Sequence, residues 1–242
     1  MKVALLGSSY IAHDMHKDVA CWGSHLASEF SNLDVINFGV SGCGLSYSKF
    51  ILDWMVETNY SPNAIILECT SIMRKHLWIG EGSNNIADYF DFKLINNSNY
   101  YSARLTGKDW DFLTMGAQLM SNSPDSDRAI RNKKDATWIY ERTILASNYE
   151  QIEWRSTVRS IEHYEKLIGC PIFVYMHDQS NHYQHDIISL INQTTATDFL
   201  HKNTNDFMFD VAHFNSHGNK YLFEHYIKPS KIIKYLQQQG IN

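Results

Sequence analysis

Short apolar runs alternate along the chain with longer stretches whose apolar residues recur at helical spacing. The run from Lys2 to Leu6 is apolar after its first residue and ends at Gly7, which predicts a buried strand. The same criteria predict strands over 2–6, 35–38, 64–67 and 172–175, a short strand or extended segment over 206–209, and helices over 16–30, 45–58, 152–167, 183–193 and 219–239. Pro229 is expected to kink or split the last helix.

The alternation of strands and helices in the first third of the chain predicts a mixed α/β fold. Parallel strands joined by crossover helices give this order of elements. In such sheets the functional residues gather beyond the carboxyl ends of the strands. Ser9, the glycine-rich loop 39–44 and the segment 68–74 each follow a predicted strand, so we expect them to share one edge of the sheet.

The segment 77–149 breaks this pattern. It is rich in Asn, Ser, Asp and Tyr and weakly periodic, yet it holds more aromatic residues than a disordered linker would. We interpret it as a partly helical insertion, packed over the sheet edge, within a single domain that spans 1–242. The pattern leaves open whether the insertion is a structural embellishment, a substrate-selecting lid or an interface.

Composition narrows the choice of partners. The net charge of the 242 residues is −5 and no basic stripe stands out, which argues against nucleic acid as the main partner. The four cysteines form no C-x-x-C pair, so they indicate core thiols of a reducing compartment rather than a zinc ribbon. No apolar run suits a signal peptide or approaches the ~20 residues of a membrane span. We expect no membrane partner, and a protein that is cytoplasmic or delivered without a signal peptide.

Three residues far apart in the sequence are the parts of a nucleophilic triad. A serine hydroxyl needs a histidine to take its proton and a carboxylate to orient that histidine. Ser9 follows the first predicted strand, and the spacing of Asp210 and His213 lets one loop set the carboxylate behind the imidazole. The alternatives are a tight turn with a helix cap for the serine and a structural role for the histidine.

The chain resembles the SGNH hydrolases, also called the GDSL esterase/lipase superfamily, in four sequence blocks. The first reads Gly-Ser-Ser over 7–9, where the family has Gly-Asp-Ser, and the second reads Val-Ile-Asn-Phe-Gly-Val-Ser-Gly over 35–42. The third, Glu-Cys-Thr-Ser-Ile-Met-Arg over 68–74, stands where the family has Gly-x-Asn-Asp. The fourth, over 210–218, matches the family's Asp-x-x-His-x-Asn-x-x-Gly in every fixed position.

This resemblance implies a fold and a set of roles. The fold is a flavodoxin-like three-layer sandwich with a small parallel sheet. Ser9 is then the nucleophile, His213 the general base and Asp210 the carboxylate that orients it. The backbone amides of Ser9 and Gly42 form the oxyanion hole, and Ser71 stands in the position of the family's oxyanion asparagine.

Three further residues are candidates for substrate binding. Asn37 or Arg74 would add an oxyanion donor, because the serine at position 71 reaches less far than an asparagine. The cation of Arg74 would also suit an anionic or sugar-acid substrate, and its alternative is a surface ion pair. Ser8 is the fallback nucleophile and the third candidate contact.

The expected chemistry is that of a serine esterase that forms an acyl-enzyme and needs no metal or cofactor. By analogy with the family, we expect the substrate to be a small-molecule or carbohydrate ester, and removal of an O-acetyl group is the reaction that the analogy favours. Two alternatives stay open. The same triad would serve an acyltransferase acting on a sugar hydroxyl. The serines at positions 8 and 71 would also fit a non-catalytic domain that binds glycans or serves as a structural component, for example of a virion.

Overall fold

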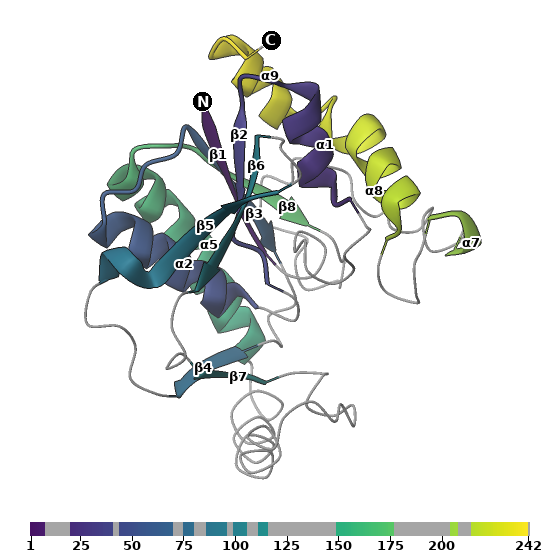
Figure 1. The fold of residues 1–242 in the computed structure, drawn as a ribbon. Coiled ribbons are helices and arrows are strands. Elements are labelled where there is room, and N and C mark those ends of the chain that lie inside the picture. Colours follow the sequence, from purple (N-terminus) through teal and green to yellow (C-terminus); the bar gives the residue numbers. More distant parts are fainter. Residues whose placement is uncertain are drawn as a thin grey trace.

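A six-stranded sheet in the order β5-β6-β2-β1-β3-β8 forms the centre of the protein, and only the β5–β6 pair is antiparallel (Figure 1). The computed structural model describes residues 1–7, 20–40, 44–69, 75–79, 86–95, 99–105, 111–115, 149–176, 204–207 and 214–241. Helices α2 and α5 flank one face of the sheet, and α1, α8 and α9 flank the other. The predicted α/β fold class, with helices on both sides of a mostly parallel sheet, is confirmed.

The strands of the central sheet are β1 (Lys2–Leu6), β2 (Asp34–Asn37), β3 (Ala64–Cys69), β5 (Phe90–Leu94), β6 (Tyr100–Leu105) and β8 (Ile172–Met176). A separate antiparallel pair consists of β4 (Lys75–Ile79) and β7 (Asp111–Met115). The helices are α1 (Trp22–Glu29), α2 (Leu45–Glu57), α5 (Tyr149–Ile168), α7 (Thr204–Phe207), α8 (Ser216–Leu222) and α9 (Lys231–Gln238), with a 3₁₀-helix η1 (Ile86–Tyr89) and a π-helix η4 (Phe223–Ile227).

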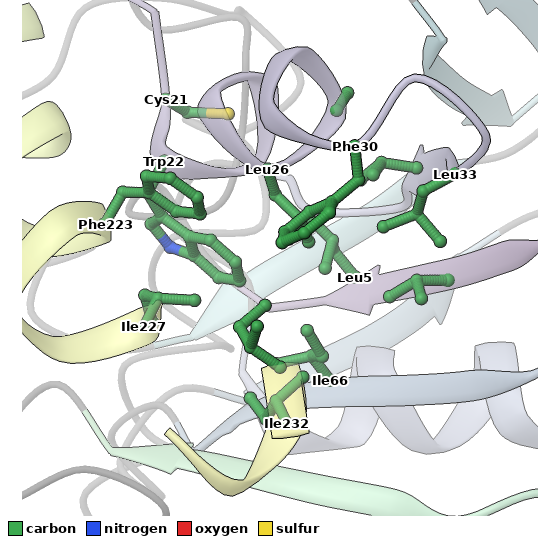
Figure 2. Close-up of a cluster of buried hydrophobic side chains, with 14 of the residues drawn as sticks. Leu5, Cys21, Trp22, Leu26, Phe30, Leu33, Ile66, Phe223, Ile227 and Ile232 are labelled. Carbon is green, nitrogen blue, oxygen red and sulfur yellow. The ribbon is translucent and has the colours of Figure 1, made fainter. Parts of the chain in front are cut away.

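Strand β1 explains why both faces of the sheet are covered. Its last four residues have no exposed surface, and successive strand residues point to opposite faces. Val3 and Leu5 pack in a cluster with α1, η4 and α9, which Figure 2 shows, whereas Ala4 and Leu6 pack with α2. A strand buried on both faces reads as an unbroken apolar run, which is the pattern seen in the sequence.

Helix α1 lies close against the sheet because position 23 is a glycine. A Cβ atom on Gly23 would lie 2.5 Å from Cδ1 of Leu5 and 3.2 Å from Cε2 of Tyr100. Any larger residue would force the side chains of Leu5 and Tyr100 to shift within the cluster around Trp22.

Part of the segment 77–149 extends the central sheet. β6 pairs in parallel with β2, and β5 pairs with the outer edge of β6. The described part of the segment contains the last residues of β4, the strands β5, β6 and β7 and the 3₁₀-helix η1. The expectation of a partly helical insertion stays a prediction, because residues 116–148 lie outside the described ranges. β5 does alternate between apolar and polar residues, yet it is only five residues long, too short to stand out from its polar surroundings.

The C-terminal helix is split, as Pro229 predicts. α8 passes into η4, where Lys228 N–H donates to Phe223 O at 2.8 Å, and α9 begins only after the proline. The first of these helices starts at Ser216, three residues before the predicted start. Residues 204–207 form the short helix α7, so the expected strand over 206–209 is wrong for its described part. The predicted helix over 183–193 lies outside the described residues.

Candidate functional site

The strand order places three carboxyl ends side by side. β1 lies between β2 and β3, and the register pairs Leu5 with Asn37 and Leu6 with Leu67. Adjacent strands lie about 4.8 Å apart, so the ends of β2 and β3 are separated by about 10 Å. Helix α1, which follows β1, covers one face of the sheet, and α5, which precedes β8, covers the other. Such a reversal opens a crevice at the carboxyl ends of the two strands, where α/β proteins bind their ligands.

Most of the predicted site residues lie outside the described part of the chain. These are Ser8, Ser9, Gly42, Ser71, Arg74, Asp210 and His213. The structure does describe the residues that flank them, and these are held together. Val40 N–H donates to Gly7 O at 3.1 Å, and Phe38 N–H donates to Leu5 O at 2.8 Å. The β1–β2 pairing therefore continues beyond the strands, toward positions 9 and 42.

A second contact joins the two ends of the chain. Ala20 N–H donates to the Ser216 hydroxyl at 3.2 Å, across 196 positions of sequence. Ala20 is the first described residue after Ser9, and Ser216 lies three residues after His213. A residue that follows the first sequence block and a residue within the fourth block thus meet in one hydrogen bond.

The fixed asparagine and glycine of the fourth block have structural roles. Asn215 caps α8 by accepting a hydrogen bond from Gly218 N–H at 2.8 Å, and its backbone N–H donates to Phe207 O at 2.9 Å. A Cβ atom on Gly218 would lie 2.2 Å from Phe207 O, so only glycine permits this contact. Together these contacts tie the two ends of the segment 208–213, which contains Asp210 and His213, to each other.

Asn37 is the one predicted substrate contact that the structure describes, and its side chain is turned into the protein. It is 1% exposed, its Nδ2 donates to the Tyr100 hydroxyl, and its Oδ1 accepts from Gly39 N–H at 2.7 Å. This differs from the expectation that its amide reaches the substrate. We assign Asn37 instead to positioning the start of the β2–α2 loop.

Tyr100 links this asparagine to helix α1. Its hydroxyl lies 2.8 Å from Sγ of Cys21, the residue that precedes α1. Burial raises the pKa of both the Tyr100 hydroxyl and the Cys21 thiol, so both groups stay neutral. From the same strand, Arg104 Nη1 donates to Gly39 O at 3.4 Å. Strand β6 therefore supplies two side chains, those of Tyr100 and Arg104, that hold the start of the β2–α2 loop.

Glu68 is a buried acidic residue at the carboxyl edge of the sheet, and the sequence did not single it out as a candidate. It is 1% exposed near the carboxyl end of β3, opposite Tyr175 of β8. A buried carboxylate is costly unless it is hydrogen-bonded or paired, and such groups gather at functional edges. The available signal was a single acidic residue that closes the apolar run of 64–67.

A cleft of about 280 Å³ lies between α2 and α5. Leu45 and Ser46 line it at the start of α2, directly after the β2–α2 loop, and Leu67 lines it near the end of β3. It also holds a hydrogen bond from the Tyr164 hydroxyl to Asp53. The cleft thus begins at the carboxyl edge and offers both hydroxyl groups and apolar surface.

Among the described residues, no group of three His, Cys, Asp or Glu side chains is arranged to hold a metal ion. Cys21 and Cys170 are buried free thiols, as the cysteine pattern predicts for these two. No helix in the described ranges is long and apolar enough to cross a membrane.

Comparison with known proteins adds a likeness of fold. The structure resembles the crystal structure of an acetyl xylan esterase, AlAXEase, over 93% of this chain and 96% of that one, with 10% sequence identity and a TM-score of 0.47. No protein-family model matches the chain, and no curated protein sequence matches it. Nothing about chemistry follows from a likeness of this size.

Proposed function

We propose that the protein is a serine esterase whose site lies at the carboxyl ends of β1, β2 and β3. The observation that carries the proposal is the pair of hydrogen bonds Val40–Gly7 and Ala20–Ser216, which hold together the described flanks of the three sequence blocks that contain the triad and Gly42. Ser9 and Gly42 each stand two residues from a hydrogen-bonded partner, and two residues span at most about 7 Å. Chain connectivity therefore supports their meeting in one site.

The proposed reaction follows the ordinary course of acyl transfer to serine. Ser9 Oγ forms a bond to the ester carbonyl carbon while His213 takes the serine proton, with Asp210 behind the imidazole. The backbone amides of Ser9 and Gly42, with the Ser71 hydroxyl, stabilise the oxyanion. The carbon–oxygen bond to the alcohol then breaks, His213 protonates that alcohol, and water releases the acid in a second, equivalent step.

We propose an O-acetylated carbohydrate as the substrate. The α2–α5 cleft supports this choice, because its volume of about 280 Å³ suits a small ring and its serine hydroxyls match a hydroxylated alcohol. Its partly exposed apolar members Phe50 and Ile161 would face the carbon–hydrogen surface of the ring.

The test compares wild type with Ser9→Ala and Ser8→Ala in hydrolysis of p-nitrophenyl acetate. Ser9→Ala is expected to lose nearly all activity and to resist labelling by a fluorophosphonate, whereas Ser8→Ala keeps most of the activity and labels normally. Urea unfolding checks that both variants fold. If only Ser8→Ala loses activity, the nucleophile is Ser8. A wild-type protein that neither hydrolyses the ester nor reacts with the fluorophosphonate would refute the proposed esterase activity and favour a non-catalytic domain. Acetate release from acetylated xylan then tests the substrate class.

A further inference from the structure

A hollow lined by aromatic residues lies on the α2 face of the sheet, at the edge opposite the proposed active site. It measures about 360 Å³ and is lined by Lys2, Asp34, Ile36, Tyr60, Phe92 and Tyr101. Lys2 and Asp34 begin β1 and β2, so the hollow lies at the amino-terminal end of these strands. The proposed catalytic groups follow the carboxyl ends, which makes this a separate site.

Two aromatic rings form the apolar wall of this hollow. Tyr60 and Phe92 are nearly parallel, with an interplanar angle of 11° and ring centres 6.0 Å apart. Phe92 is the outermost member of an aromatic cluster that includes Phe38 and Trp54, and it is 40% exposed. Phe92 therefore presents part of its ring to solvent where it lines the hollow.

The polar groups of the hollow define what would fit there. Lys2 contributes a positive charge 6.0 Å from the Tyr60 ring and Asp34 a negative one, so the two charges offset each other. The Tyr60 hydroxyl oxygen has almost no accessible surface and no hydrogen-bond partner within the described residues, so the hollow meets this residue through its ring. A ligand with hydroxyl groups would offer donors and acceptors to both charges.

We propose that this hollow binds one ring of a neutral polysaccharide, independently of the esterase activity. A pyranose ring with equatorial hydroxyls has flat carbon–hydrogen faces that pack on aromatic rings, and its hydroxyls reach the groups around them. The small volume limits the site to one or two rings. Neutrality follows from the paired charges of Lys2 and Asp34, which favour neither an anionic nor a cationic ligand.

The test uses cellohexaose and xylohexaose as probes, titrated into the full chain and followed by NMR or calorimetry. Phe92→Ala is expected to weaken binding of at least one probe about tenfold, because it removes half of the aromatic wall. The matched control is Leu94→Ala, on the same strand and 46% exposed but outside the hollow, which should bind as wild type does. Hydrolysis of p-nitrophenyl acetate should be the same in both variants, so that failure of this site and failure of the proposed esterase are told apart.

Tyr60→Phe is a second control, because it keeps the ring and removes only the hydroxyl. Removing a buried hydroxyl without a partner should leave stability equal or slightly higher and binding of the probes unchanged. The proposal is overturned if wild type binds neither probe, or if Phe92→Ala binds as tightly as Leu94→Ala. It is also overturned if sedimentation shows a dimer that Phe92→Ala abolishes, since the aromatic wall would then be an interface between two copies of the chain.

Discussion

Replacing Gly218 by alanine tests how helix α8 is anchored. Position 218 is the third residue of α8, and within a helix alanine is more favourable than glycine by up to about 1 kcal/mol on propensity alone. The structure predicts the opposite sign. The new Cβ would lie 2.2 Å from Phe207 O and 3.0 Å from its carbonyl carbon, and both are backbone atoms that no rotamer change can move aside.

The magnitude follows from the contacts that must give way. Moving α8 outward costs about 1–3 kcal/mol in repacking. It also strains two hydrogen bonds at Asn215, its N–H to Phe207 O at 2.9 Å and its Nδ2 to Asp206 O at 3.0 Å, each worth about 1 kcal/mol. Set against the gain in propensity, the net loss is about 2–4 kcal/mol. With an m-value near 3 kcal/mol/M, the urea midpoint falls by roughly 0.7–1.3 M.

The assay is urea unfolding followed by circular dichroism, with Lys220→Ala as the control. Lys220 is exposed on the same helix and pairs only loosely with Glu224, so its removal should change the free energy of unfolding by less than about 0.5 kcal/mol. Asn215→Ala should cost about 1 kcal/mol as the loss of a helix cap. If Gly218→Ala is as stable as wild type or more stable, helix propensity governs this position and the anchoring argument is refuted.

Two further predictions concern buried hydroxyl and thiol groups. Tyr100→Phe should lower the free energy of unfolding, measured in urea, by about 1–3 kcal/mol, because it leaves Asn37 Nδ2 and Cys21 Sγ without this partner. Tyr60→Phe should not lower it, because the Tyr60 hydroxyl has no partner within the described residues. Equal effects of the two substitutions would contradict the hydrogen-bond assignment. Burial, and secondarily the charge of Glu165, raises the pKa of Cys170 to about 12 from an ordinary 9.0. The unfolded chain thus ionises first, and stability falls as the pH rises from about 9 to about 12. Cys170→Ala should reduce this loss of stability by about 1 kcal/mol at pH 10, measured from urea midpoints at pH 7.5 and 10. If the midpoints of wild type and Cys170→Ala change equally between the two pH values, the raised pKa of Cys170 is refuted.

The sequence predicted those elements whose apolar pattern is long, or whose residues are buried on both faces of the sheet. β1 and β3 read as unbroken apolar runs because both faces are covered, and α2 repeats its buried residues at helical spacing. The start of α8 was placed too late because Gly218 is a poor helix former. Its presence there is explained by the backbone of Phe207, which no local pattern reveals.

The site was predicted less completely, for a related reason. Sequence blocks identify residue types, but the direction of a side chain depends on partners that are distant in the chain. Asn37 is turned inward by Tyr100, which stands 63 positions later in a strand that the pattern did not predict. The anchoring roles of Asn215 and Gly218 likewise depend on their contacts with Phe207. The sequence of the fourth block alone therefore does not tell residues that hold the structure from residues proposed for the chemistry.

The position of β6 changes how the insertion is understood. An embellishment laid over a finished domain would leave the loop after β2 supported by the core strands alone. Here β6 pairs with β2 itself and contributes both Tyr100 and Arg104 to the residues that hold Asn37 and Gly39. The described start of the β2–α2 loop is therefore held by two residues of β6, so changes in β6 should act on this loop and on any chemistry there, even though the strand lies outside the four sequence blocks.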